Sequence, residues 1–168
     1  MDAPEAARAL GRLMGRYPAH EFLVGAGTVL DWSAAQAALD AGAGFLVTPH
    51  ADPDLVARIS EAGVPVIPGA FTPTEALRVW RAGAAAVKVF PASVLGPAFV
   101  REMRGPLPQI PLIPTGGVTA ETAADFLAAG AVAVGVGSWL TGSGQDRLVT
   151  ERARQLVAAV ARVAPPAR

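Results

Sequence analysis

Residues 82–91 have the sequence Ala82-Gly83-Ala84-Ala85-Ala86-Val87-Lys88-Val89-Phe90-Pro91. Glycine after alanine suits the left-handed residue that ends a helix, and the apolar run after it suits a parallel strand buried on both faces. The same phrase recurs before other apolar runs, at Ala41-Gly42, Ala62-Gly63 and Ala129-Gly130. Repeated helix–strand units of this kind predict a parallel α/β architecture.

The expected elements alternate along the whole chain. Periodicity and cap signals predict helices at 2–16, 33–41, 53–62, 73–82, 96–104, 120–129 and 146–162, and strands at 21–28, 44–48, 64–68, 85–90, 110–114 and 131–135. A doubly wound sheet and a (β/α) barrel both produce this alternation, and periodicity does not separate them. Polar residues and glycines gather where the strands end, and in a barrel those ends converge on one active site. We therefore favour the barrel, although six strands are two short of the usual eight.

Composition limits the classes of function. The 168 residues are 52% hydrophobic and 17% charged, which fits one compact α/β domain spanning residues 1–168. Fourteen acidic residues balance fourteen basic ones, so no overall field recruits nucleic acid or an anionic membrane, and small molecules are the expected partners. There is no cysteine, no apolar signal core at the N-terminus and no uninterrupted apolar stretch of membrane-spanning length. We expect a soluble, cytoplasmic protein.

Lys88 is the only lysine in the chain, and it lies in an apolar run where a solvated surface lysine would be out of place. In a strand, Lys88 and Phe90 share a face while Val87 and Val89 point the other way. Burial disfavours the charged ammonium, so the amine would stay nucleophilic near neutral pH and could form a Schiff base with a carbonyl substrate. The alternative is a lysine at a strand end whose ammonium reaches water, and this segment alone supports both interpretations equally.

Two pairs of glycines close the last two expected strands, in Pro114-Thr115-Gly116-Gly117 and Gly135-Val136-Gly137-Ser138. Glycines allow backbone N–H groups to approach a bound anion, and the loops after the last two strands of barrels commonly bind phosphate. The alternative is two tight strand-to-helix turns. Two such pairs at successive strand ends favour a phosphorylated substrate. Neither a Gly-x-Gly-x-x-Gly motif nor a P-loop lysine motif is present, so dinucleotide and nucleoside triphosphate binding are not supported.

Other polar residues are better explained by structure than by chemistry. The histidines His20 and His50 have no carboxylate at metal-ligand spacing, so we expect no metal site. Glu75 follows Thr72-Pro73 at the start of an expected helix, where the helix dipole accounts for it. A proton-transfer role for Glu75 is the less favoured alternative.

Several strand-end motifs in one order carry a family resemblance: Val24-Gly25-Ala26-Gly27-Thr28, Val47-Thr48-Pro49-His50, Val87-Lys88-Val89-Phe90-Pro91, Pro114-Thr115-Gly116-Gly117 and Gly137-Ser138-Trp139-Leu140. From about residue 2 to the C-terminal helix, the chain resembles the KDPG/KHG aldolase family. The resemblance implies a (β/α)8 barrel, usually trimeric, that cleaves 2-keto-3-deoxy-6-phosphogluconate to pyruvate and glyceraldehyde 3-phosphate. Many members also cleave 4-hydroxy-2-oxoglutarate.

The resemblance also implies roles for particular residues. Lys88 matches the Schiff-base lysine, Thr28, Pro49, Phe90 and Thr115 match its pocket, and Gly116, Gly117, Gly137 and Ser138 match the phosphate loops. The protonated imine then acts as the electron sink while the C3–C4 bond breaks, without a metal or another cofactor. The alternatives are an aldolase for the galactonate-derived epimer, or a non-catalytic module that binds phosphate esters.

One departure from the family bears on activity. The family begins with a strand, a helix and a second strand carrying Glu-x-x-x-Arg, whereas Met1 aligns with the start of the helix after that strand. We therefore expect about six strands and an intact lysine with weakened turnover, since general acid–base help is typically worth about 10²–10⁴-fold. A fragment or an upstream start is the favoured explanation. The alternatives are a gap filled by a neighbouring subunit and a genuine short form.

Overall fold

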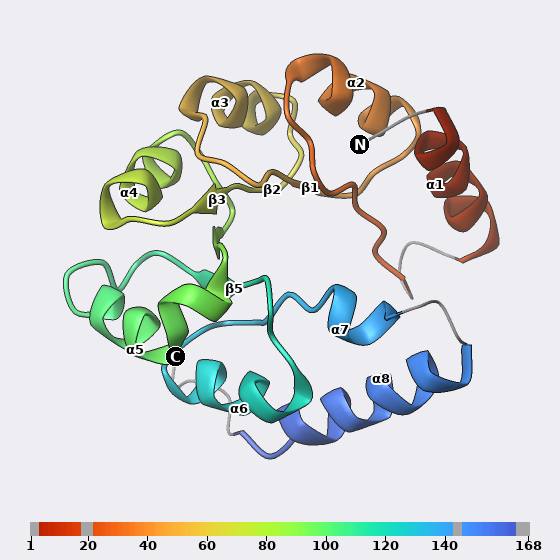
Figure 1. Ribbon diagram of the computed structural model, residues 1–168. Helices are drawn as coiled ribbons and strands as arrows, with labels where there is room; N and C mark the ends of the chain where they lie inside the picture. Colours follow the sequence, from red (N-terminus) through yellow and green to blue (C-terminus); the bar gives the residue numbers. More distant parts are fainter. Residues whose placement is uncertain (1–3, 18–21, 143–145, 164–168) are drawn as a thin grey trace. The chain divides into compact units, whose positions relative to one another are not determined.

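The computed structural model describes residues 4–17, 22–142 and 146–163 (Figure 1). The chain divides into two compact units, Met1–Val87 and Lys88–Arg168. Each unit is described by itself, and the single domain expected from the sequence remains a prediction. In the described residues, no helix is both long and apolar enough to span a membrane.

The first unit alternates short strands with helices, in the order α1 (Pro4–Arg16), α2 (Trp32–Asp40), β1 (Leu46–Val47), α3 (Pro53–Glu61), β2 (Val66–Ile67), β3 (Gly69–Ala70) and α4 (Pro73–Arg81). Strands β1 and β2 pair in parallel, with Leu46 opposite Val66. Figure 1 shows α2, α3 and α4 following one another along the same side of β1, β2 and β3. This is the predicted helix–strand repeat.

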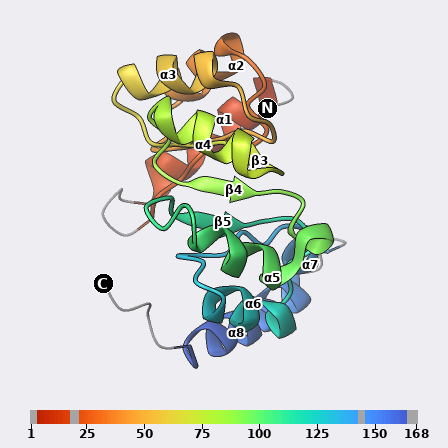
Figure 2. The ribbon, with the colours of Figure 1, turned by 90° about the vertical axis from the view of Figure 1, so that its left-hand side faces the viewer.

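The second unit continues the pattern with β4 (Val87–Val89, which begins at the unit boundary), α5 (Ala92–Arg104), β5 (Leu112–Pro114), α6 (Ala120–Ala128), α7 (Ser138–Thr141) and α8 (Asp146–Val160). Strands β4 and β5 lie side by side, and Thr115 N–H donates to the Val89 carbonyl at 2.9 Å (Figure 2). Residues 132–135 continue the pairing beyond β5, because Val132 N–H donates to Leu112 and Gly135 N–H to Pro114. Helices α6 and α8 pack against each other.

The sequence signals for helix ends are confirmed. Side chains of Asp31, Asp52 and Thr72 accept hydrogen bonds from first-turn N–H groups of α2, α3 and α4. The alanine at each predicted helix end is followed by a glycine with positive φ, at Gly42, Gly63, Gly83 and Gly130. Glycine adopts this conformation without the penalty of a Cβ, so each helix ends where the sequence pattern places it.

Aliphatic side chains from strands, helices and the segments between them form the cores of the units. The largest fully buried side chains include Leu46, Val56, Ile59, Val66 and Val79 in the first unit, and Val89, Val100, Ile110, Leu112 and Val118 in the second. Full burial of each side chain of this size contributes roughly 1.5–3 kcal/mol relative to exposure. These cores hold the strand ends, where the candidate site lies.

Two expected strands do not form as continuous strands. The described part of segment 21–28 starts at residue 22 and forms one isolated parallel bridge, between Ala26 and Leu46. Segment 131–135 also forms one, between Gly135 and Thr115. The first segment is hydrogen-bonded to β1 and the residues before it through Val24 and Ala26, and the second to β5 through Val132 and Gly135. That pairing is too sparse to satisfy the pattern of a regular strand.

Three other features differ from the prediction by more than a shift of one or two residues at an element's end. The strand expected at 64–68 is interrupted after Ile67, because Pro68 lacks an N–H, and the chain pairs again at β3. Helix α5 begins at Ala92, four residues before the predicted start, and is broken at Gly96, whose φ of 68° and ψ of 173° are not helical. The four-residue helix α7 is too short to give a periodic signal.

Candidate functional site

Lys88 lies in the middle of β4, between two buried valines. The Val87 and Val89 side chains occupy the opposite face of the strand, as predicted from the alternation of side chains. Lys88 itself is half-buried, and this burial lowers the pKa of its amine below the ordinary lysine value. The fraction of nucleophilic neutral amine at a given pH is therefore larger than for a solvated lysine.

Phe90 provides an aromatic wall for the amine. Lys88 Nζ lies 4.1 Å from the centroid of the Phe90 ring, so the two side chains share the strand face that the sequence predicted for them. The negative face of the ring favours the protonated amine, and this opposes the effect of burial. The amine is thus partly desolvated and lies against an aromatic ring.

The loop after β5 closes onto the end of β4 and the start of α5. Ala92 N–H donates to the Thr115 carbonyl at 2.8 Å, and Ser93 N–H donates to the Gly116 carbonyl at 2.9 Å. A Cβ on Gly116 would lie 3.0 Å from the Phe90 ring, so this backbone passes directly against the aromatic wall. Gly116 is therefore packed against Phe90, and Thr115 is hydrogen-bonded to the strand that carries Lys88.

Thr115 holds its hydroxyl in a defined hydrogen bond. Its Oγ1 donates to the Ile113 carbonyl at 3.2 Å, and the residue is partly buried. While this bond persists, the hydroxyl can accept a hydrogen bond from a substrate but cannot donate one. To orient a substrate carboxylate, the role that the resemblance implies, the O–H bond must turn from Ile113 toward the carboxylate while Oγ1 keeps its position.

The glycine loops follow neighbouring segments of one sheet. The parallel bridge between Thr115 and Gly135 sets the strand ends side by side, immediately before Gly116-Gly117 and Gly137-Ser138. The Gly137 carbonyl accepts the N–H groups of Leu140 and Thr141, so Gly137 caps α7 and Ser138 is its first residue. Gly117, Gly137 and Ser138 are all exposed at this edge.

Thr28 and Pro49 belong to the first unit, whereas Lys88 belongs to the second. Thr28 is exposed and has a φ of 59°, a conformation that is unusual for a β-branched residue. The next residue, Val29, donates its N–H to the Val47 carbonyl at 3.1 Å, so Thr28 and the Thr48-Pro49 turn follow adjacent segments. Gly69 passes so close to the Pro49 carbonyl that no Cβ would fit there.

Glu75 has the structural role that the sequence favoured. Its carboxylate accepts the N–H groups of Phe71 and Thr72 at 2.9 and 2.8 Å, and Thr72 Oγ1 accepts the Glu75 N–H to complete a capping box. The Phe71 hydrogen bond is the largest of the influences that lower the pKa of this carboxyl. The hydrogen bonds of this carboxylate thus join it to its own helix start.

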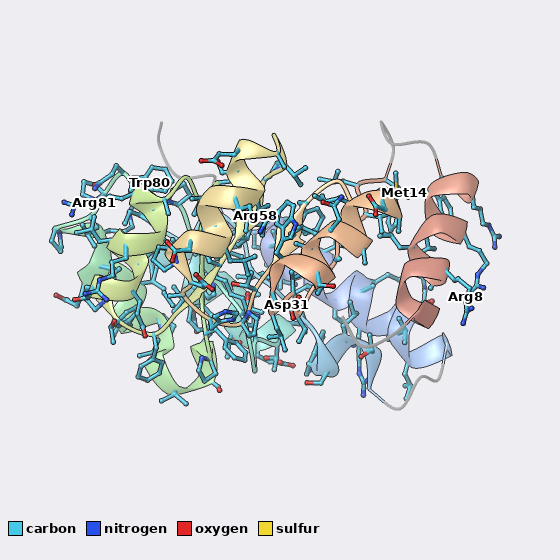
Figure 3. The ribbon with its side chains drawn as sticks, turned by 90° about the horizontal axis from the view of Figure 1, so that it is seen from above. Arg8, Met14, Asp31, Arg58, Trp80 and Arg81 are labelled. Atoms are coloured by element: carbon cyan, nitrogen blue, oxygen red, sulfur yellow. The ribbon has the colours of Figure 1, made fainter. Side chains whose placement is uncertain are left out.

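The outer helices of the first unit carry contacts unrelated to this chemistry. Figure 3 labels Asp31 and Arg58 on α2 and α3, and the Arg58 guanidinium lies 4.0 Å from the Trp32 ring centroid. No group of three potential metal-ligating side chains occurs among the described residues; His20 is outside them. The sequence interpretation missed Ser93, and it grouped Gly135 with the anion-binding glycines without anticipating its contact with Thr115; both contacts depend on pairing between distant segments.

Comparison with known proteins gives consistent matches. The family model for KDPG and KHG aldolase matches residues 2–155. A probable 2-dehydro-3-deoxy-6-phosphogalactonate aldolase of Rhizobium meliloti is 37% identical over 141 residues, which cover 83% of this chain and 66% of that protein. The chain thus spans slightly less than two thirds of the length of this relative.

Solved structures match as well. A native KDPGal structure aligns with a TM-score of 0.88 and 32% identity, covering 94% of this chain and 77% of the other. A KDPG aldolase from Legionella pneumophila, with pyruvate captured as a covalent carbinolamine, aligns with a TM-score of 0.79 and 26% identity over 98% of this chain and 79% of the other. These likenesses confirm the predicted (β/α)-barrel fold family, although the described strands form no closed barrel. The chain belongs to the KDPG and KHG aldolase family.

Proposed function

We propose that this chain carries the imine-forming site of a class I aldolase, with Lys88 as the nucleophile. The observation that carries the proposal is the half-buried amine of Lys88 over the Phe90 ring, with its pKa lowered by burial. A desolvated amine in an aromatic pocket is suited to attack a carbonyl carbon. The Legionella pneumophila relative, in which pyruvate was captured covalently, supports the same class of chemistry.

The proposed reaction begins with attack of neutral Lys88 Nζ on the C2 carbonyl carbon. Loss of water from the carbinolamine gives a protonated imine, which accepts the electron pair of the C3–C4 bond as that bond breaks. The C4 hydroxyl loses its proton and becomes the aldehyde product, while the remaining enamine takes a proton at C3. Hydrolysis of the imine releases pyruvate and regenerates the amine.

The proposed substrate is a phosphorylated 2-keto-3-deoxy acid, with 2-keto-3-deoxy-6-phosphogluconate as the first candidate. Gly116, Gly117, Gly137 and Ser138 would hold the phosphate, because their exposed loops end neighbouring segments of one sheet. Phe90 and Thr115 would contact the pyruvoyl end. Thr28 and Pro49, in the first unit, keep the substrate-binding role that the family resemblance implies for them as a separate prediction. The 6-phosphogalactonate epimer is the second candidate, favoured by the Rhizobium meliloti relative. Cleavage of 4-hydroxy-2-oxoglutarate would be an additional activity.

Trapping with pyruvate and borohydride tests the proposal. Because Lys88 is the only lysine, trypsin should release residues 82–88 and 89–101 from unmodified protein and the uncleaved peptide 82–101 from the adduct. Lys88→Met is the matched control and should give no adduct. A folded chain that binds phosphate esters without forming the adduct would instead be a non-catalytic binding module.

The proposal includes a cytoplasmic homotrimer, the assembly that the family resemblance implies. Sedimentation tests the assembly directly, since one chain has a mass of 17.1 kDa. A species of three times that mass is expected. A monomer at working concentration would contradict this part of the proposal without affecting the imine chemistry.

A further inference from the structure

Gly135 lies opposite Thr115 in the parallel bridge at the end of β5. Its backbone leaves no room for a side chain on the side that faces Thr115. A Cβ built there would lie 2.8 Å from Thr115 Cγ2 and 3.1 Å from Thr115 Cβ, and closer still to Oγ1. Either the threonine side chain or the backbone would have to move to admit one methyl group.

The backbone conformation of Gly135 does not itself demand glycine. Gly116 and Gly117, on the facing loop, have φ values of 91° and 77°, where any L side chain is strained. Gly135 is absent from the positive-φ residues of the described chain. The contact with Thr115 is therefore what excludes a side chain at position 135.

The position of the Thr115 hydroxyl depends on this contact. Threonine is β-branched, so a side chain pushed at Oγ1 and Cγ2 must change rotamer or move its backbone. Either change would break or distort the 3.2 Å hydrogen bond to the Ile113 carbonyl that now orients the hydroxyl. We propose that Gly135 is a positioning residue, whose missing side chain sets the orientation in which Thr115 meets the substrate. This inference rests on the proposed aldolase function.

A double-mutant cycle tests the inference. Gly135→Ala should lower kcat/KM for the phosphorylated 2-keto-3-deoxy acid at least about tenfold, which corresponds to roughly 1.4 kcal/mol of transition-state stabilisation. In a Thr115→Ala background the same change should cost less than about twofold, because the Oγ1 and Cγ2 atoms that it would strike are gone. Equal losses in both backgrounds, or no loss in the Thr115 background, would overturn the proposal.

Controls separate positioning from general damage. Gly105→Ala, in the same unit, places a Cβ in ordinary contact at 3.5 Å from the Glu102 carbonyl and should leave kcat/KM unchanged. All variants should still form the Lys88 adduct at saturating pyruvate, because the reactive amine is unchanged in each of them. If Gly135→Ala does not fold, the double variant Gly135→Ala/Thr115→Ala should still fold and should have the kcat/KM of Thr115→Ala alone. A double variant that does not fold would also contradict the inference.

The outcome can be distinguished from failure of the proposed function. A wild-type chain that forms no pyruvate adduct would contradict the aldolase proposal. The same cycle would then be measured by calorimetric binding of 3-phosphoglycerate, a small phosphorylated acid. Non-additive loss of binding would support positioning by Gly135, and additive loss or no binding by wild type would overturn it.

Discussion

Replacing Gly116 with alanine perturbs the aromatic wall of the site in a way that can be estimated from the structure. The new Cβ would lie 3.0 and 3.1 Å from two atoms of the Phe90 ring and 3.4 Å from Pro91 Cα. The φ of 91° also places the alanine in the left-handed region. Two penalties therefore combine, one from the backbone and one from the ring.

The backbone penalty is about 1–2 kcal/mol, offset by about 0.4–1 kcal/mol because alanine restricts the unfolded chain more than glycine does. Moving the Phe90 ring away from its preferred rotamer costs a further 0.5–1.5 kcal/mol or so. We therefore expect Gly116→Ala to lower the free energy of unfolding by about 2 kcal/mol, a decrease in Tm of roughly 4–8 °C.

Gly42→Ala is the matched control. Gly42 has a φ of 90°, almost that of Gly116, but its Cβ would meet only Met14 Cγ at an ordinary 3.6 Å. This variant should lose about 1 kcal/mol from the backbone alone. Thermal unfolding measures the difference between the variants, which is the cost of displacing Phe90.

The rate of the borohydride-trapped pyruvate adduct supplies the second readout. The Phe90 ring lies 4.1 Å from Lys88 Nζ, so its displacement should change the trapping rate about twofold to tenfold in Gly116→Ala, with no change in Gly42→Ala. Equal losses of Tm in the two variants, together with unchanged trapping in both, would refute the reasoning that Gly116 supports this wall.

Three further substitutions test separate parts of the account. Lys88→Met should abolish the adduct without lowering Tm at neutral pH, because it removes a desolvated ammonium. In wild type, the trapping rate should rise with pH and approach its plateau below the ordinary lysine pKa of 10.5. Because the pKa of Lys88 is lower in the folded chain, the unfolded chain binds this proton more tightly. The contribution of Lys88 to the free energy of unfolding should therefore rise with pH between the folded pKa and 10.5. Melting curves of wild type and Lys88→Met, recorded across this pH range, measure that contribution. Thr28→Asn should preserve Tm, because asparagine tolerates a φ of 59° better than threonine, and should raise KM if Thr28 contacts substrate. Glu75→Gln should lower stability by about 0.5–1 kcal/mol in chemical denaturation with kcat unchanged, because Glu75 caps α4.

Contrary results for Lys88→Met and Glu75→Gln would each change a residue's assigned role. A trapped adduct in Lys88→Met would place the reactive amine elsewhere, and a loss of kcat in Glu75→Gln would restore its proton-transfer role. The pKa of Glu75 is lowered in the folded chain, so its stabilising contribution is present above the ordinary value of 4.5 and is lost as the pH falls below it. A Glu75→Gln variant as sensitive to acid as wild type would contradict that contribution.

Local signals in the sequence predicted much of the fold. The cap residues Asp52 and Thr72 and the alanine–glycine helix ends act within one turn of chain, so their sequence pattern contains the whole interaction. The shared face of Lys88 and Phe90 also follows from the two-residue period of a strand. These predictions required no knowledge of distant segments.

Features that depend on pairing between segments could not be predicted in the same way. The contact of Gly135 with Thr115 depends on strand register, and the contact of Ser93 with Gly116 depends on how α5 meets the β5 loop. The kink at Gly96 was missed for a different reason: it reflects a local φ of 68°, which the apolar pattern of α5 does not encode. The sequence therefore singled out Lys88, the proposed nucleophile, but did not predict the contacts that support its surroundings.

Peptide mapping after treatment with pyruvate and borohydride tests directly whether Lys88 forms the imine. The reduced adduct should protect Lys88 from trypsin and appear on the uncleaved peptide 82–101. The corresponding peptide of Lys88→Met should carry no adduct. Complete cleavage after Lys88 in folded, pyruvate-saturated protein would contradict the assignment of Lys88 as the imine-forming residue.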